Sequence, residues 1–218
     1  KGDFIGNRLD STATLRGVAI YNYNQSHIGN IEGSFIGNVG NNTGKFYTMG
    51  GAITNTSNSV IDSIKSNFVQ NTLIGSINNV LGGAILNNVN STIKYIEGDF
   101  VENSVTTGDA VASGGGIWTS VTIGEIVNSN FIGNYAKTST DGEAKGGAIY
   151  SSSSLNIIVD NGVSTFSGNY TQVGEEVDDN AIYIDNAESS LNFQLKNGGS
   201  IVMKDNIRGL VSTTTETL

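Results

Sequence analysis

GGAIYSSSS (146–154) is nearly repeated twice earlier in the chain, as GGAITNTSN (50–58) and GGAILNNVN (82–90). A motif of this kind begins at six positions: Gly17, Gly50, Gly82, Gly114, Gly146 and Asp179. The successive starts lie 33, 32, 32, 32 and 33 residues apart. A constant spacing of about 20–50 residues indicates a repeat architecture, in which every unit is one copy of the same small structure.

A second motif, Phe-x-x-Asn, keeps step with the first. It occurs at Phe4/Asn7, Phe35/Asn38, Phe68/Asn71, Phe100/Asn103, Phe131/Asn134 and Phe166/Asn169, with Met203/Asn206 in the seventh place. Pairs of isoleucines three residues apart, such as Ile61 and Ile64, recur between the two motifs. We expect the Phe, Ile and Asn positions to form structural ladders from one unit to the next.

The repeat units contain short β-branched stretches and turn residues but no apolar stripe of helical length, so each unit predicts two or three short strands. A unit this small cannot bury its apolar side chains alone, whereas stacked units bury them at the strand spacing of about 4.8 Å. The sequence therefore predicts an all-β fold, a right-handed parallel β-helix or solenoid. We expect about six coils of about 32 residues, with one longer loop per coil, as a single segment over residues 1–218.

The repeated Gly and Asn residues predict the corners of the coil. Gly-Gly suits a corner that needs a positive φ or no Cβ atom. The Asn of Phe-x-x-Asn is expected at another corner, in the left-handed conformation, with its amide hydrogen-bonded to the Asn residues above and below. Polar segments of 9 to 11 residues lie between the Asn and the next Gly-Gly, and they share little sequence, as is typical of loops on a fixed scaffold.

Composition excludes several classes of function. The chain has 29 Gly, no Pro and no Cys, so disulfides, thiolate metal sites and cysteine nucleophiles are excluded. Its net charge of -9 and the lack of a Lys/Arg cluster argue against nucleic acid as a partner. The longest apolar runs are far too short to span a membrane.

The paired motifs support a resemblance to known repeats. GGA[ILV] with FxxN resembles the repeats of chlamydial polymorphic outer membrane proteins, and IEGSFIGN (31–38), IEGDFVEN (96–103) and IVNSNFIGNYA (126–136) resemble those of bacterial autotransporter passengers. The resemblance covers Phe4 to Asn206. It implies secretion to the bacterial outer cell surface, an extracellular location, and a role in adhesion or self-association. Because the chain begins on Lys inside a repeat, we interpret it as a piece of a longer passenger.

Two acidic loop segments are candidates for binding a cation. They contribute Asp141, Glu143, Glu175, Glu176, Asp178 and Asp179. Oxygen-rich loops bind Ca²⁺, although neither segment has the pattern of an EF-hand or of the Asp-bearing nonapeptide repeat, and ordinary solvated loops are the favoured interpretation. Stacked carboxylates would also suit a polysaccharide-processing enzyme. The basic residues are scattered along the chain, however, and form no constellation with these acids, so no catalytic residue and no cofactor are predicted.

The position after each motif Ile is a candidate binding surface. One column runs through it, in which Tyr21, Trp118, Tyr150 and Tyr183 are aromatic. Strand alternation places this column on the side opposite to the inward Ile. If the face is open, the column suits sugar stacking or contact with a partner protein. If the ten-residue loops fold over it, the column is a second core, which is the interpretation we favour because exposed aromatic rings are costly.

The leading functional hypothesis is a segment of a bacterial surface adhesin or a self-associating passenger. Such a rod would present its loops and lateral faces to a host glycan, a host surface protein or another copy of itself. A polysaccharide-processing enzyme on a β-helix scaffold remains one alternative. A structural filament grown end to end through unpaired strand edges remains another.

Overall fold

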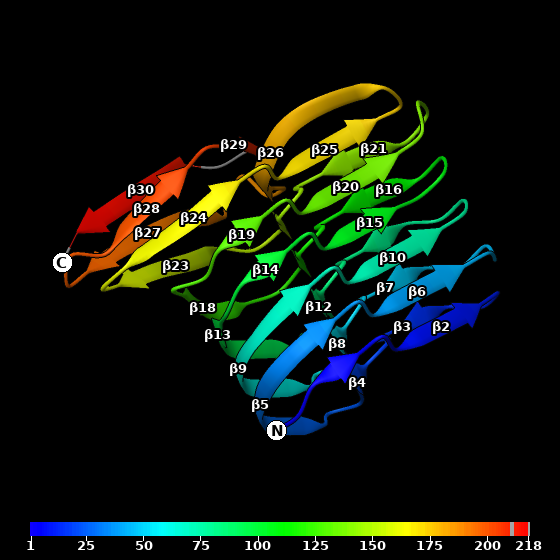
Figure 1. Ribbon diagram of the computed structural model, residues 1–218, viewed down its shortest axis with the longest axis horizontal. Coiled ribbons are helices and arrows are strands. Elements are labelled where there is room, and N and C mark those ends of the chain that lie inside the picture. The colour runs from blue at the N-terminus through cyan, green and yellow to red at the C-terminus, as the bar shows by residue number, and fades with distance from the viewer. Residues whose placement is uncertain (210–211, 218) are drawn as a thin grey trace.

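The computed structural model describes the backbone of residues 1–209 and 212–217 and the side chains of residues 1–209. Over these residues the chain consists of thirty β-strands without a helix, and its parallel strands stack as a solenoid of about six turns (Figure 1). The predicted parallel β-helix is thus confirmed. The described part of the chain holds no helix with the length and hydropathy to cross a membrane.

The core sheet carries the Ile pairs and the Phe column. Its strands, in chain order, are β1 (Phe4–Ile5), β5 (His27–Ile36), β9 (Val60–Val69), β13 (Thr92–Glu97), β14 (Phe100–Val101), β18 (Ile123–Val127), β19 (Phe131–Ile132), β23 (Leu155–Asp160), β24 (Val163–Ser167), β27 (Ser190–Lys196), β28 (Ser200–Met203) and β30 (Ser212–Thr217).

Two further columns of strands flank the core sheet, one after each motif. The strands that contain or follow the GGAI motif are β4 (Ile20–Asn22), β8 (Ile53–Asn55), β12 (Ile85–Asn87), β17 (Ile117–Thr119), β22 (Ile149–Ser151) and β26 (Glu176–Ile184). The strand β29 (Asn206–Gly209) continues this column by pairing with β26. The strands that follow Phe-x-x-Asn are β2 (Arg8–Ser11), β6 (Val39–Asn42), β10 (Thr72–Gly75), β15 (Ser104–Thr106), β20 (Tyr135–Thr138) and β25 (Tyr170–Val173).

The loops expected between the motifs are themselves built of stacked strands. A five-stranded sheet, which we call the fin sheet, contains β3 (Leu15–Arg16), β7 (Thr48–Met49), β11 (Val80–Leu81), β16 (Val111–Ser113) and β21 (Glu143–Lys145). It faces the strands after Phe-x-x-Asn, and the two columns enclose a small core of Leu15, Leu73, Val80, Val105, Ala112 and Ala136. In Figure 1 these paired strands form the row of hairpin-like projections at the upper right. The loops thus form a fin rather than irregular connections.

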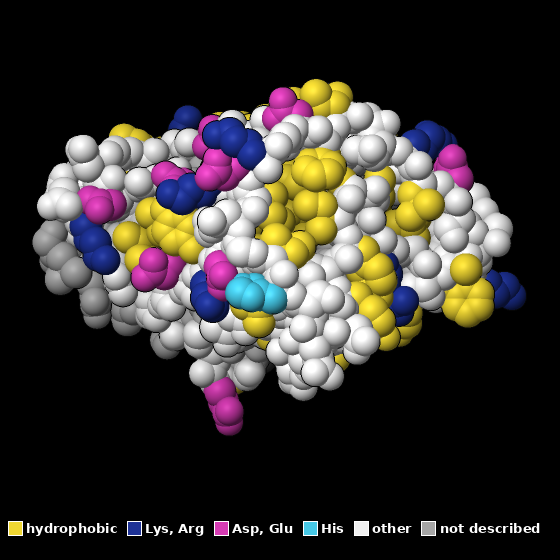
Figure 2. Space-filling model, turned by 90° about the horizontal axis from the view of Figure 1, so that it is seen from below, with side chains coloured by type: hydrophobic (Ala, Val, Ile, Leu, Met, Phe, Trp, Pro, Cys, Tyr) yellow, Lys and Arg dark blue, Asp and Glu magenta, His cyan; other side chains and the backbone are white. Residues whose placement is uncertain are grey.

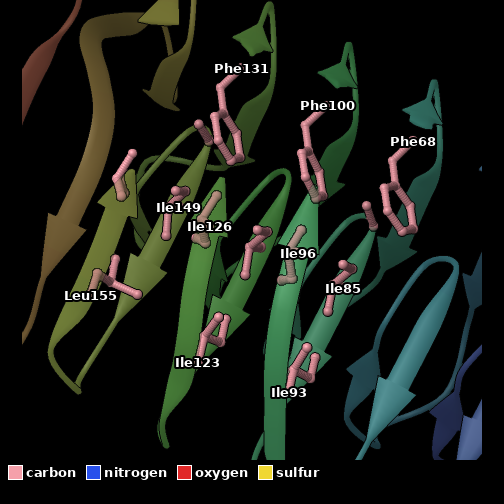
Figure 3. Close-up of a cluster of buried hydrophobic side chains, with 14 of the residues drawn as sticks. Phe68, Ile85, Ile93, Ile96, Phe100, Ile123, Ile126, Phe131, Ile149 and Leu155 are labelled. Carbon is pink, nitrogen blue, oxygen red and sulfur yellow. The ribbon is translucent and has the colours of Figure 1, made fainter. Parts of the chain in front are cut away.

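The main core is a set of side-chain columns at one strand spacing. Ile53, Ile85, Ile117 and Ile149 are in register and fully buried. Phe68, Phe100 and Phe131 stack with ring centroids 4.8 Å apart and ring planes within 11° (Figure 3). The spacing of the rings is set by the backbone ladder, since neighbouring strands lie about 4.8 Å apart. The same column continues to Phe4 and Phe35 on one side and to Phe166 on the other.

Both glycines of the GGAI motif are required by geometry. Gly82, the first, has a φ of +70°, a left-handed conformation that glycine adopts without strain. At the second, Gly83, a Cβ atom would lie 2.0 Å from the carbonyl oxygen of Gly115 in the next coil. The corner therefore needs one glycine for its backbone conformation and the other for the close approach of coils.

The Asn of Phe-x-x-Asn forms a buried ladder, which we call the Phe-x-x-Asn ladder. Its members Asn38, Asn71, Asn103, Asn134 and Asn169 are fully buried. From Asn38 to Asn134, each side-chain nitrogen donates to the Oδ1 atom of the next Asn, for example at 2.8 Å from Asn71 to Asn103. Each also donates to a Phe carbonyl of the preceding coil, for example at 2.9 Å from Asn71 to Phe35. The conformational prediction was wrong by one residue, because the positive φ lies on the residue before the Asn, such as Gln70 or Glu102. The Asn itself is not among the residues with a positive φ, and its side chain is buried.

The sixth coil departs from the repeat at both motifs. The acidic segment before it forms an antiparallel hairpin between β25 and β26, so the sequence Asp179 to Ile182 lies in a strand and not at a Gly-Gly corner. The last rung of the Phe-x-x-Asn ladder is Asp205 and not Asn206, which is exposed. Asp205 accepts hydrogen bonds from Gly168 N, Asn169 N and Asn169 Nδ2 at 2.7–2.9 Å. Its carboxylate therefore receives the donors that a further Asn would receive.

Candidate binding surface

The predicted aromatic column follows one lateral face of the solenoid. The strands after GGAI hold it in register, with Leu86 beside Trp118, Trp118 beside Tyr150 and Tyr150 beside Tyr183. Its side chains alternate with the buried Ile, as the period of two predicted. The column is neither fully open nor fully covered: fin-sheet residues contact it in places, with Met49 O accepting a hydrogen bond from Thr54 and Lys145 lying over the Tyr183 ring.

The exposure of the column changes along the solenoid. Tyr21 is 42% exposed, Thr54 and Leu86 are fully buried, and Trp118, Tyr150 and Tyr183 are half-buried. The last three rings stack face to face, with centroids 5.5 and 6.1 Å apart and ring planes within 5°. Stacked in this way, neighbouring rings cover part of each other's faces. The favoured prediction of a covered second core is therefore wrong for these three rings, and the alternative of open faces for sugar stacking does not fit them either.

A cluster of polar groups flanks the stacked rings. Lys145 of the fin sheet places its Nζ atom 3.0 Å from Glu143 Oε2, 3.7 Å from Asp185 Oδ2 and 5.4 Å from the centre of the Tyr183 ring. The Tyr150 hydroxyl donates a hydrogen bond of 2.6 Å to Asp185. Partial burial lowers the pKa of Lys145, but the hydrogen bond to Glu143 and the charge of Asp185 outweigh it and raise the pKa above its ordinary value. The cluster thus satisfies its own charges.

The phenol of Tyr150 provides a pH-dependent prediction. Burial, together with the hydrogen bond to Asp185, raises the pKa of Tyr150 well above the usual range. The unfolded chain releases this proton near pH ~10. The stabilising contribution is therefore complete below that pH and is lost as the pH rises towards the pKa of the folded state. We expect urea melts between pH 9 and 11 to lose stability more steeply for the wild type than for Tyr150→Phe. Parallel pH curves for the two proteins would contradict this assignment, and Tyr47→Phe, at an exposed tyrosine, is the matched control.

The candidate cation ligands are distributed over two elements and partly engaged elsewhere. Glu143 contacts Lys145, and Asp178 forms a two-point contact with Arg208 at 2.7 and 3.2 Å. Asp141, Glu175, Glu176 and Asp179 lie exposed. Among residues 1–209, no group of three or more His, Asp or Glu side chains is placed to hold a metal ion. The structure thus does not bring the six acids together into one site, and Ca²⁺ binding stays a prediction.

A second buried Asn ladder was missed from the sequence. Asn22, Asn55 and Asn87 follow the start of each GGAI-like motif by five residues, and the side-chain nitrogen of each donates to the next coil: 2.8 Å from Asn22 to Asn55 and 2.8 Å from Asn55 to Asn87. The constant offset from the motif is the signal that would have revealed it. The stacked pair Tyr135 and Tyr170, with centroids 5.1 Å apart, also follows the register of the coils.

The surface also carries a pocket that was not foreseen from the sequence. It lies beside the first three coils and has a volume of about 260 Å³. Its lining includes Tyr21, which belongs to the predicted column, together with Arg16 and Tyr23. We call it the tyrosine pocket. Here the aromatic side chains are the most exposed of the column region, since Tyr23 is 49% exposed.

Comparisons with known proteins found no relative of this chain. No family model matches the chain, and no curated protein and no solved structure matches it. The resemblance to autotransporter repeats therefore stays a prediction from the GGAI and Phe-x-x-Asn motifs.

Proposed function

We propose that the chain is a rigid binding rod, a passenger-type segment displayed on the bacterial outer cell surface that holds a lateral face towards a host glycan. A host surface protein or a second copy of the chain are the other partners of the same hypothesis. The motif pattern supports the location, and the architecture supports the mechanical role. The rod is extracellular in this proposal and acts without catalysis.

The observation that carries the proposal is that the buried Asn side chains of the Phe-x-x-Asn ladder are hydrogen-bonded to one another from coil to coil. Asn38, Asn71 and Asn103 link successive coils through side-chain hydrogen bonds of 2.7–2.8 Å, and the fully buried Phe column runs parallel to them. A buried polar network that is fully satisfied holds a single register, because any slip would leave buried donors and acceptors unpaired. Such a scaffold keeps side chains on its lateral face at fixed mutual positions, which is what repeated weak contacts to an extended partner require.

Surface display and binding are tested separately. Antibodies raised against the purified chain should label intact bacteria without permeabilisation, and labelled chain should bind saturably to at least one class of glycan or matrix protein on an array. Labelling only after permeabilisation would overturn the surface location. Absence of binding across glycans, matrix proteins and immobilised chain would overturn the binding role. Release of reducing ends from a polysaccharide would replace it by the enzymatic alternative.

A further inference from the structure

The tyrosine pocket combines aromatic, polar and basic groups from three coils. Arg16, Tyr21 and Tyr23 come from the first coil, and Thr56, Ser57 and Asn88 come from the next two. The Tyr21 and Tyr23 rings lie 5.3 Å apart with an interplanar angle of 21°. The volume of about 260 Å³ lies just below the range of about 300–1,000 Å³ for small-molecule sites, so it suits one sugar-sized group.

Of the three arginines of the chain, only Arg16 forms no ion pair with an acidic residue in the part of the chain that the structure describes. Arg8 contacts Asp10 at 2.8 Å and Arg208 contacts Asp178 at 2.7 Å, whereas Arg16 forms no ion pair with any residue in the described part of the chain. On the face shown in Figure 2, too, most Lys and Arg side chains adjoin an Asp or Glu. An unpaired guanidinium in a chain of net charge -9 marks a local site for an anion.

Lys145 provides an internal comparison. Arg16 and Lys145 are each the last residue of a fin strand and directly precede the first Gly of a GGAI-like motif. Each also lies beside a tyrosine of the column. Glu143 and Asp185 neutralise Lys145. No carboxylate lines the pocket around Arg16. The cation at this position is therefore paired with carboxylates of the chain at Lys145, whereas at Arg16 it is available to a ligand.

Two residues of the pocket lining, Ser57 and Val89, belong to turns with a positive φ. Consecutive residues with positive φ occur at Asn24–Gln25, Ser57–Asn58 and Val89–Asn90, in the same turn of three successive coils. Val89 has a φ of 51°, which is an outlier for a β-branched residue, and its side chain is 52% exposed at the rim. Such strain concentrates at ligand sites, where the surrounding fold holds polar groups in position before the ligand binds.

We propose that the tyrosine pocket binds a saccharide residue that carries a carboxylate, such as a uronic acid. The Arg16 guanidinium pairs with the carboxylate. The outer face of the stacked Tyr21–Tyr23 pair packs against the apolar face of the sugar, since the two rings cover only each other's inner faces. The Thr56 and Ser57 hydroxyls and the Asn88 amide are available to its hydroxyl groups. This inference rests on the proposed binding function and names the ligand class of one site within it.

Isothermal titration calorimetry with D-glucuronate, D-glucose and inorganic phosphate tests the ligand class. We expect D-glucuronate to bind and both other probes to bind at least tenfold more weakly, since glucose lacks the charge and phosphate lacks the sugar ring. Arg16→Gln should weaken D-glucuronate binding by about tenfold or more, the loss expected for one charge-assisted hydrogen bond. Lys45→Gln, which removes the same charge from the surface outside the pocket, is the matched control and should leave the affinity unchanged.

The ring contribution has its own control. Tyr23→Ala should weaken D-glucuronate binding, whereas Tyr47→Ala, at a tyrosine with a similar exposure of 50%, should not. Circular dichroism of each variant shows that the solenoid is folded. Equal affinity for D-glucuronate and D-glucose, equal affinity for phosphate, or an unchanged affinity in Arg16→Gln would each overturn the inference. If the wild type binds neutral glycans or matrix proteins on the array but not D-glucuronate, this inference fails while the binding rod stands. If it binds nothing, both fail.

Discussion

Replacing Phe100 with Ala is expected to lower the free energy of unfolding by about 3–5 kcal/mol, the usual cost of truncating a buried aromatic side chain. Phe100 is fully buried and stacks on Phe68 and Phe131, each 4.8 Å away (Figure 3). The spacing of its neighbours is fixed by backbone hydrogen bonds between coils, so the column cannot collapse to fill the cavity. The loss should therefore lie near the upper part of that range.

Urea denaturation followed by circular dichroism measures this loss. Ile132→Ala is the control, since Ile132 belongs to the adjacent strand of the same sheet but is 41% exposed. Its truncation should cost less than about 1 kcal/mol because 41% of its surface is already in water and no closed cavity is left. Similar losses for the two variants would show that burial in the Phe column does not dominate the stability of the coil.

Replacing Asn103 with Ala is expected to be comparably severe, at about 3–5 kcal/mol, although it removes no apolar packing. The side chain donates to Phe68 O at 2.8 Å and to Asn134 Oδ1 at 3.0 Å. Its own Oδ1 atom accepts from the backbone and side-chain nitrogens of Asn71. The substitution removes these bonds from Asn71 N and Phe68 O, whereas Asn134 Oδ1 keeps Asn103 N and Asn71 Nδ2 keeps Phe35 O. Each buried group left unsatisfied costs about 1–3 kcal/mol.

Gln70→Ala is the matched control for Asn103→Ala. Gln70 also links two coils through a side-chain amide, which donates 2.8 Å to Glu102, but this hydrogen bond lies on the exposed surface. We expect its loss to change the free energy of unfolding by no more than about 0.5 kcal/mol. If the denaturation midpoints of the two variants fell together, burial of the Asn ladder would not be what makes it stabilising.

The repeat made the core predictable from the sequence. A period of 32 between Gly50, Gly82 and Gly114 is also the offset at which Ile53, Ile85 and Ile117 pair in the structure. In a solenoid, equal spacing in the chain becomes contact in space, so the inward columns follow from the motif alone. The Phe column follows for the same reason.

The fin and the pocket depend on information that the repeat does not carry. The fin core includes Leu73 and Val80, which lie in the segments between the motifs. These segments differ in sequence from coil to coil, so the repeat does not predict their packing. The tyrosine pocket joins Arg16 and Tyr21 to Asn88, more than two coils away along the chain, and their proximity depends on how each coil turns at its corner. The left-handed residue before each ladder Asn was missed because Gly37, Gln70 and Glu102 share a conformation and not a residue type.

Asp205 makes the last unit of the Phe-x-x-Asn ladder non-interchangeable with the others. In the Phe-x-x-Asn ladder each Asn side chain donates a hydrogen bond to the next residue, in the direction from Asn38 to Asn169. Asp205 accepts the last of these bonds, and its carboxylate has no hydrogen to donate further. Excising a central unit of 32 residues would keep every donor opposite an acceptor. Moving the sixth unit to the centre would instead set its carboxylate against a Phe carbonyl and an Asn oxygen. Recombination or engineering can therefore add or remove units among the Asn rungs, whereas the unit that contains Asp205 has to stay the last acceptor of this ladder.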